Sequence, residues 1–222
     1  MEEGEIVALG GPPVPGGTLI LTSGLRAGGS LGVNIQYQGV YRLLSCAHVL
    51  TAFDPNFVGK TINYCEEGWQ NPQPLTTVTG MVPVTVYPTS DPPNPVRNVQ
   101  DLAWANITPQ LGSPEITNIG TPSGIRAPKT EQVQVYGGVS NSEVQTTKIL
   151  SLTARTTMKS LSSDGSTYVY TFWQSVMQLD AGNIALLGGD SGSAVVATAD
   201  QAVVGLAFSI GTINVYACPI VT

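Results

Sequence analysis

The chain has 222 residues and a net charge of −6 at pH 7, with 15 acidic side chains against 9 basic ones. Hydrophobic residues make up 42% of the sequence, which is enough for a sizeable core, whereas charged residues make up only 11%. An acidic surface repels a phosphate backbone, and Lys and Arg form no cluster in the sequence, so nucleic acid is excluded as an expected partner.

The predicted elements are β-strands along almost the whole chain. Residues 1–16 form a lead-in rich in Gly and Pro, and strand-like runs follow it. Several runs alternate apolar and polar residues with the period of two that is typical of half-buried strands. No long stretch has a helical period, although a short helix is expected just after His48. The predicted strands are Thr18–Thr22, Leu31–Tyr37, Val40–Ser45, Val78–Tyr87, Leu102–Ile107, Gln132–Tyr136, Thr147–Ala154, Tyr168–Trp173, Ser175–Leu179, Ser193–Thr198, Ala202–Phe208 and Ile213–Ala217.

A segment near the middle of the chain, 108–123, is rich in Pro, Gly, Thr and Asn and has little periodicity. We interpret residues 109–123 as a linker between two β-barrels, formed by residues 17–108 and 124–222. The Pro-rich stretch 87–98 is expected to be a loop, because proline cannot donate to the ladder of a central strand. The predicted fold class is therefore all-β.

Two of the residues that could carry chemistry lie in the first predicted barrel. His48 is the only histidine of the chain, and an imidazole titrates near neutrality, as a general base must. Asp101 directly precedes the apolar run Leu102–Ile107, where an ionised carboxylate has to find donors. Taken alone, His48 could be a buried side chain bonded to the backbone, and Asp101 could be a strand cap.

Ser191 lies in the glycine-rich segment Gly188-Gly189-Asp190-Ser191-Gly192-Ser193. Glycines let the backbone turn sharply and let a substrate approach closely, so the N–H groups of Gly189 and Ser191 can point at one spot and form an oxyanion hole. The same segment would also suit an ordinary hairpin turn. Together with His48 and Asp101, however, Ser191 completes the nucleophile, base and orienting carboxylate that acyl transfer by serine needs.

Five segments resemble the chymotrypsin/trypsin-like serine proteases, in the same order along the chain. Ala47-His48 is similar to the family's Ala-Ala-His, Asp101-Leu102-Ala103 to its Asp-Ile-Ala, and Gly189-Asp190-Ser191-Gly192-Ser193 to its nucleophile motif. Downstream, the run 204–209 resembles the strand beside the substrate, and the run 214–217 resembles the closing Gly-Val-Tyr-Ala. In character, bacterial members without zymogen activation are the most similar.

The resemblance implies two six-stranded antiparallel β-barrels with the active site in the cleft between them. It implies a serine endopeptidase that acts on a protein or peptide substrate without a cofactor. His48 would be the general base and then the acid, Asp101 would orient it, Ser191 would attack, and Gly189 and Ser191 would supply the oxyanion N–H groups. Control by self-cleavage, by a partner protein or by a fused regulatory domain stays open.

Two departures from the family concern activation and specificity. Ile6-Val7 could serve as a new N-terminus for Asp190 after cleavage, but Glu5-Ile6 is not a basic cleavage site, so we expect Asp190 to be held internally. A gapless alignment places Ala185 where trypsins have an Asp, which predicts no preference for Arg or Lys. The expected specificity pocket is narrow and uncharged, favours small or medium uncharged residues, and is formed by Ala185, Phe208, Ser209, Ile210 and Asn214.

The three cysteines, Cys46, Cys65 and Cys218, leave at least one thiol unpaired. We expect all three to be reduced core thiols, with a Cys46–Cys65 disulfide as the alternative. Zinc is not expected, because the chain has no Cys-x-x-Cys pair and a single histidine. Reduced thiols and an acidic N-terminus indicate a cytoplasmic protein, although a secreted form with its signal removed is the alternative. No stretch approaches the roughly 18 apolar residues of a membrane helix, so no membrane partner is expected.

Two other functions are alternatives to an active protease. The first is a protease fold that has lost catalysis and serves as a binding module, although such a chain need not retain all three residues. The second is an α/β-hydrolase esterase, which needs Gly-x-Ser-x-Gly on a strand–turn–helix with its histidine last in the chain. Here His48 comes first and the surroundings are rich in strands, which disfavours the esterase.

Overall fold

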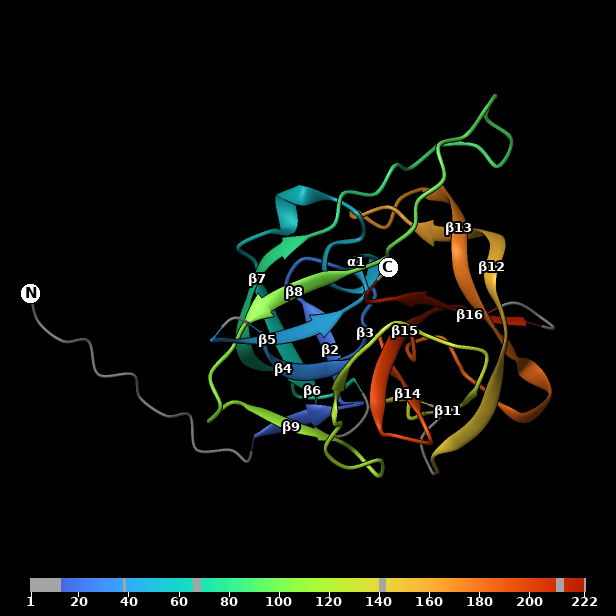
Figure 1. Cartoon of the computed structure of the whole chain (residues 1–222). Coiled ribbons are helices and arrows are strands. Elements are labelled where there is room, and N and C mark those ends of the chain that lie inside the picture. The colour runs from blue at the N-terminus through green and yellow to red at the C-terminus, as the bar shows by residue number, and fades with distance from the viewer. Residues whose placement is uncertain (1–12, 38, 66–68, 140–142, 211–213, 222) are drawn as a thin grey trace, which may run out of the picture.

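Two β-sheets, each built from one half of the chain, lie side by side in the computed structural model (Figure 1). The structure describes residues 13–37, 39–65, 69–139, 143–210 and 214–221. The first half runs from blue to green in Figure 1 and the second half from yellow to red. In the described residues, no helix is long and apolar enough to span a bilayer.

The first sheet has seven strands and is curled. In spatial order they are β3 (Gly29–Ser30), β2 (Leu19–Thr22), β6 (Thr61–Cys65), β7 (Gln73–Met81), β8 (Ala103–Asn106), β5 (Val40–Ser45) and β4 (Val33–Tyr37). All neighbouring pairs are antiparallel. A separate parallel pair, β1 (Val14–Gly16) and β9 (Gly112–Ile116), lies against β4, where the Asn34 amide donates to the carbonyls of Val14 and Ser113 at 2.8 Å each.

The second sheet closes into a barrel. Its order is β10 (Gly124–Ile125), β15 (Ala202–Ile210), β14 (Ala194–Ala197), β11 (Gln132–Val135), β12 (Gln145–Leu161), β13 (Tyr168–Asp180) and β16 (Asn214–Pro219). Pairing between β15 and β16 joins the two ends, so six of the strands form the barrel and β10 is added in parallel to β15. The antiparallel ladders along β11 to β16 bury the alternate apolar side chains inside this barrel.

The predicted all-β, two-barrel class is confirmed, with one difference in the first half. Among the described residues β3 does not pair with β4, so the first sheet is curled rather than closed. The physical reason is that β3 has only two residues. In addition, the Ser30 N–H donates to the carbonyl of Ser191 at 2.7 Å and not to a neighbouring strand. The predicted linker 109–123 contains β9, and the domain boundaries stay a prediction.

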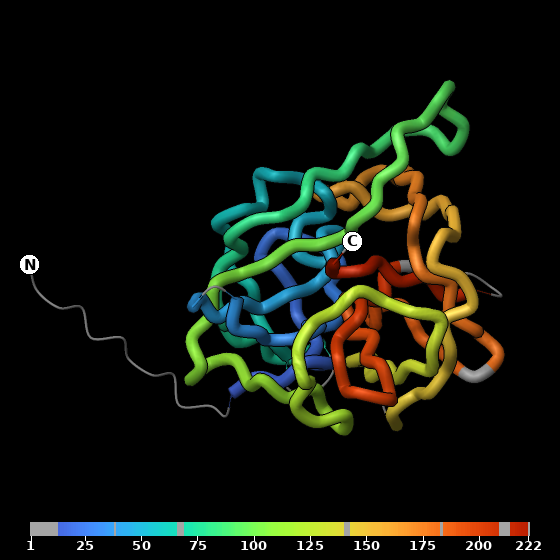
Figure 2. Tube along the Cα trace, viewed as in Figure 1, coloured from blue at the N-terminus to red at the C-terminus, as the bar shows by residue number. Residues whose placement is uncertain are grey.

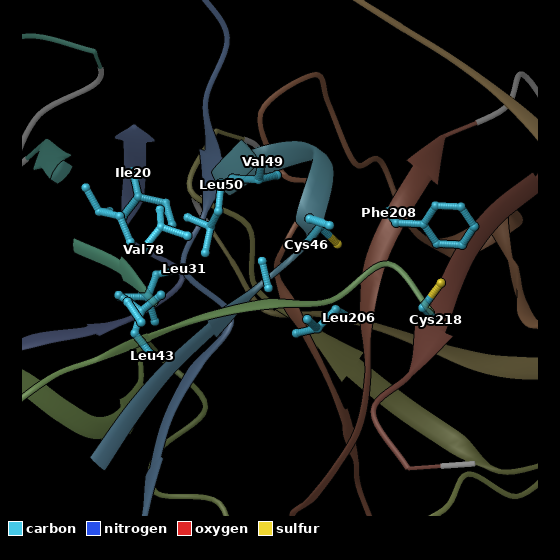
Figure 3. Close-up of a cluster of buried hydrophobic side chains, with 14 of the residues drawn as sticks. Ile20, Leu31, Leu43, Cys46, Val49, Leu50, Val78, Leu206, Phe208 and Cys218 are labelled. Carbon is cyan, nitrogen blue, oxygen red and sulfur yellow. The ribbon is translucent and has the colours of Figure 1, made fainter. Parts of the chain in front are cut away.

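The halves share a core. One cluster of buried residues takes Ile20, Leu31, Leu43 and Leu50 from the first sheet side and Trp173, Leu206 and Phe208 from the second. Figure 3 shows this arrangement, with Cys46, Val49 and Leu50 of the short helix region facing Leu206, Phe208 and Cys218 across the core. Because these buried side chains pack closely against one another, they hold the two halves in one relative orientation.

A long hairpin and a loop form the outer wall on one side. Strands β12 and β13 continue beyond the barrel, and the loop between β7 and β8 runs along β13 (Figure 2). The backbones of Tyr87 and Tyr170 exchange two hydrogen bonds of 2.8–2.9 Å, and the Asn98 N–H donates to the carbonyl of Phe172 at 2.7 Å. We call the projecting parts of β12 and β13, together with the loop between β7 and β8, the hairpin wall. It joins the Pro-rich loop of the first half to the second barrel.

Candidate active site

His48 and Asp101 form the most directly bonded pair of the predicted site. His48 lies in helix α1 (Ala47–Thr51), which follows β5, and Asp101 lies just before β8, the neighbour of β5. The His48 Nδ1 and the Asp101 Oδ2 are 2.5 Å apart, and the His48 backbone N–H donates to Asp101 Oδ1 at 3.1 Å. The carboxylate is fully buried, so these two donors offset its desolvation and fix the imidazole in position.

Two consecutive tight turns present Ser191. The Asp190 N–H donates to the Leu187 carbonyl at 3.0 Å, and the Ser193 N–H donates to the Asp190 carbonyl at 3.1 Å. The third residue of each turn is a glycine with positive φ, Gly189 at 106° and Gly192 at 97°. That conformation strains any residue with a Cβ, so the two glycines allow both turns to form, with Ser191 as the second residue of the second turn.

Asp190, between the two turns, is fully buried and held by internal donors. Its Oδ1 accepts the Val139 N–H at 2.8 Å and its Oδ2 accepts the Leu187 N–H at 2.7 Å. These bonds match the expectation that Asp190 is ordered internally. Ile6 and Val7, which the alternative of a cleaved N-terminus involved, lie outside the described residues.

The Ser191 hydroxyl faces the carbonyl of Phe208. Its Oγ donates to the Phe208 oxygen at 3.4 Å, and no hydrogen bond in the described part of the chain joins it to His48. Both His48 and Ser191 nevertheless line the same cleft. Catalytic hydrogen bonds are often long or absent before substrate binds, and rotation about the Cα–Cβ bond of Ser191 redirects the hydroxyl.

The backbone N–H groups of Gly189 and Ser191 have no protein acceptor in the described residues. The neighbouring N–H groups of Asp190, Gly192 and Ser193, in contrast, are all engaged. Two unengaged N–H groups beside a serine hydroxyl meet the chemical requirement for binding an oxyanion, which is the presence of free donors.

The cleft at His48 and Ser191 has a volume of about 680 Å³ and lies between the halves of the molecule. The loop after β2, the hairpin wall and the residues just before Ser191 also line this cleft. The lining residues include Leu25, Arg26, Ala27, Ala52, residues 156–163, Leu186, Leu187, Gly188, Phe208 and Tyr216.

The predicted specificity residues are only partly brought together. Phe208 lines the cleft, whereas Ala185 and Asn214 are not among the described residues that line it. Ala185 is exposed and donates its N–H to the Gln145 side chain, and Asn214 accepts from the Gln178 amide at 2.7 Å. The side chains of Ser209 and Ile210 lie outside the described part. Leu186 and Leu187, which an ungapped alignment does not assign to the pocket, do line the cleft.

A row of three aromatic rings leads from the His48 imidazole into the core. The Phe53 ring lies 5.9 Å from the His48 ring between centroids, the Trp173 ring lies 6.2 Å from Phe53, and the Phe208 ring lies 5.0 Å from Trp173. Phe53 comes from the first half, and Trp173 and Phe208 come from the second. This row therefore links the His48 ring to the strand whose carbonyl accepts the Ser191 hydroxyl.

The buried thiols of Cys46 and Cys218 lie near the Asp101 carboxylate. All three cysteines are free and buried, as expected, so the alternative Cys46–Cys65 disulfide is wrong. Burial, followed by the nearby Asp101 carboxylate, raises the pKa of the Cys46 and Cys218 thiols well above 9.0. Ligand atoms of Cys46, His48 and Asp101 lie within 4.8 Å of one another, but a metal would need the thiolate that this environment disfavours.

One residue that contacts the Ser191 turn was missed in the sequence. Ser30 lies in β3 and is fully buried, and its hydroxyl donates to the carbonyl of Gly189 at 3.0 Å. The signal available was Gly28-Gly29-Ser30 in front of an apolar strand, because paired glycines indicate a close approach of two backbones. The sequence could not indicate which backbone approaches.

The fold is similar to solved protease structures, although no protein-family model and no curated protein matches the sequence. Thermobifida fusca protease A is 17% identical, with 94% of this chain and 92% of that chain covered and a TM-score of 0.57. Cellulomonas bogoriensis chymotrypsin is 15% identical over 94% and 92%, with a TM-score of 0.58. A Nocardiopsis protease is 14% identical over 94% and 93%, with a TM-score of 0.56. The chain therefore has the fold of the chymotrypsin-like serine proteases, as the sequence resemblance predicted.

Proposed function

We propose that this protein is a serine endopeptidase in which Ser191 is the nucleophile, His48 the general base and acid, and Asp101 the residue that orients His48. The observation that carries the proposal is the buried Asp101 carboxylate, which bonds both the Nδ1 and the backbone N–H of a histidine that shares a cleft with Ser191. The protease fold of the chain supports the same reaction class.

The reaction follows from these positions. Asp101 engages Nδ1, which leaves Nε2 of His48 to accept the proton of Ser191 while Oγ attacks the carbonyl carbon of the scissile peptide. The negative charge that develops on the carbonyl oxygen is stabilised by the N–H groups of Gly189 and Ser191. The C–N bond then breaks, and His48 returns the proton to the leaving amine. Water, deprotonated by His48, cleaves the acyl ester and restores Ser191.

The substrate that this cleft suits is a peptide with an uncharged, apolar residue before the scissile bond. Leu186, Leu187 and Tyr216 line the cleft. Among the described residues the lining contains no carboxylate, and its cations, Arg26 and Lys159, would repel a basic side chain. Ala185 stands where a trypsin has its acid, which further argues against Arg and Lys. Apolar walls favour apolar side chains by desolvation.

Cleavage of a peptide library, read by mass spectrometry, tests the function and the preference together. Wild type is expected to cleave internal peptide bonds, whereas Ser191→Ala and His48→Ala, each folded, are expected to lose essentially all turnover. Ser90→Ala, which removes a serine hydroxyl from the exposed Pro-rich loop, is the matched control and should cleave like wild type. Turnover retained in either active-site variant contradicts the assignment.

A second function is favoured by one observation, the Ser191 hydroxyl that donates to Phe208 rather than to His48. If that bond persists with peptide bound, the chain is a binding module with a protease fold. Binding of library peptides to the wild type without cleavage, with the same affinity in Ser191→Ala, would favour this alternative.

The three free, buried thiols also bear on location. Thiols that stay reduced are typical of the cytoplasm, and we propose that the protein works there. Cell fractionation combined with thiol labelling checks this, and recovery of the protein only from the oxidising exterior would contradict it.

A further inference from the structure

Ser30 connects the first sheet to the turn that presents Ser191. It is fully buried in β3 and belongs to neither the triad nor the cleft lining. Its hydroxyl donates to the carbonyl of Gly189 at 3.0 Å and accepts the N–H of Gly138 at 2.9 Å. Its backbone N–H donates to the carbonyl of Ser191 at 2.7 Å.

These bonds fall on Gly189 and Ser191, the two residues whose backbone N–H groups have no acceptor in the described part of the chain. Gly189 and Ser191 each have their carbonyl held by Ser30, one by its hydroxyl and the other by its backbone. A fixed carbonyl limits rotation of its residue, and Gly189 needs such a limit because glycine has the widest choice of backbone conformations. Ser30, which lies in the first sheet, thereby restrains the backbone of both residues.

The contact is direct because glycines let the backbones meet. A Cβ placed on Gly29 would lie 2.5 Å from the Ser191 carbonyl oxygen, and one on Gly192 would collide with the Ser30 oxygen and the Ser45 hydroxyl. Ser45 in turn donates its hydroxyl to the Ser30 carbonyl at 2.8 Å. Ser45 therefore anchors the Ser30 backbone, whereas Gly138 and Gly189 anchor its hydroxyl, so Ser30 is held in place on both sides.

We propose that Ser30 is a positioning residue of the active site, which holds Gly189 and Ser191 so that both N–H groups point at one oxyanion. The inference rests on the proposed function. It predicts that loss of the Ser30 hydroxyl weakens transition-state stabilisation more than substrate binding, because a misaimed donor matters only when charge develops on the carbonyl oxygen.

The test compares p-nitrophenyl acetate with its thiono counterpart, in which sulfur replaces the carbonyl oxygen. Sulfur is a weak acceptor, so the thiono ester gains little from the oxyanion N–H groups. Acylation of Ser30→Ala by the oxygen ester is expected to fall about 100-fold, at the low end of the loss on removing one oxyanion donor. Acylation by the thiono ester should fall far less, so the ratio of the two rates shrinks.

Controls separate positioning from packing. Thr22→Val removes another fully buried hydroxyl from the neighbouring strand β2, one without a hydrogen-bond partner in the described structure, and should keep the wild-type ratio. If Ser30→Ala does not fold, Ser30→Cys fills the same space with a weakly bonding thiol and is read in the same way. An active wild type whose ratio is unchanged in the folded Ser30 variant overturns this inference alone. A folded wild type that is not acylated at all overturns the proposed function, and this inference with it.

Discussion

The two carboxylate oxygens of Asp101 accept hydrogen bonds from different groups of His48. One oxygen holds the Nδ1 of His48 at 2.5 Å, and the other accepts the His48 backbone N–H at 3.1 Å, one of the first-turn donors that a helix leaves unpaired. The carboxylate thus fixes both the ring and the start of helix α1. Charge-assisted bonds of this kind are roughly twice as strong as neutral ones, which explains how a fully buried acid is tolerated.

Asp101→Asn is expected to reduce kcat by about 10⁴-fold with little change in KM, because an amide that donates to Nδ1 leaves the imidazole in the wrong tautomer to accept a proton. Steady-state kinetics on a cleaved library peptide measures this. Asp91→Asn, which removes the same charge from the exposed Pro-rich loop, is the control and should match wild type. A loss confined to KM would show that Asp101 acts on binding instead.

At this scale, the sequence predicted the side chains and missed their supports. His48, Asp101 and Ser191 can be predicted from the sequence because each stands in a local motif with a chemical rationale. Ser30 cannot, because its hydroxyl bond to Gly189 spans 159 residues and depends on how two sheets meet. The specificity pocket stays a prediction, and an ungapped alignment could not indicate that Leu186 and Leu187 line the cleft while Ala185, which precedes them, does not.

Helix α1 ends in a strained conformation that affects the site. Its C-cap Ala52 has φ 48° and the next residue, Phe53, has φ 65°, both in the left-handed region that residues with a Cβ avoid. In this conformation the centroid of the Phe53 ring lies 5.9 Å from that of the His48 ring. Such strain persists where the surrounding packing enforces it, and here the Trp173 ring holds Phe53 from the other side.

Ala52→Gly is expected to raise the free energy of unfolding by about 1 kcal/mol, because glycine adopts the left-handed cap without steric cost. For a chain of this size that is an increase in Tm of roughly 2–4 °C, measurable by thermal unfolding. Ala47→Gly, in the first turn of the same helix and without a positive φ, should change Tm in the opposite direction. A lower Tm for Ala52→Gly would mean that its methyl group, at the cleft, contributes more than the strain costs.

Strand β13 shows how far sequence patterns carry at the scale of an element. The alternation predicted two strands, Tyr168–Trp173 and Ser175–Leu179, but the structure has one strand from Tyr168 to Asp180. The interruption is real and local, because Ser175 has φ 54° and the register with β12 shifts nearby. A bulge keeps a strand continuous while it breaks the alternation, which sequence patterns cannot distinguish from a turn.

At the scale of the whole molecule, the core that the two halves share contains one buried thiol from each half. Cys46 precedes helix α1 in the first half and Cys218 lies in β16 of the second, and both are in the core that the halves share (Figure 3). Burial and then the Asp101 carboxylate raise the pKa of both thiols well above 9.0. The folded protein therefore keeps these protons at pH values where the unfolded chain loses them.

The raised pKa values of the two thiols predict that the free energy of unfolding falls as the pH rises above about 9. A pKa raised by folding means that the stability it contributes is complete below about pH 9 and is lost as the pH rises toward the folded-state pKa. The free energy of unfolding is expected to fall by as much as about 1.4 kcal/mol per pH unit for each thiol. Denaturant unfolding between pH 8 and 10.5 measures the slope. The double variant Cys46→Ala/Cys218→Ala should show a shallower slope, and an equal slope would refute the role of the thiols.

The reaction of Ser191 with a fluorophosphonate, followed by intact mass and peptide mapping, tests most directly whether the triad is active. Wild type is expected to gain one adduct, mapped to Ser191, and Ser191→Ala to gain none. His48→Ala, folded to the same Tm as wild type, should react more slowly by at least about 10³-fold, because the serine has lost its base. A folded wild type that stays unlabelled, or one that His48→Ala matches in rate, would contradict the assignment of Ser191 as an activated nucleophile.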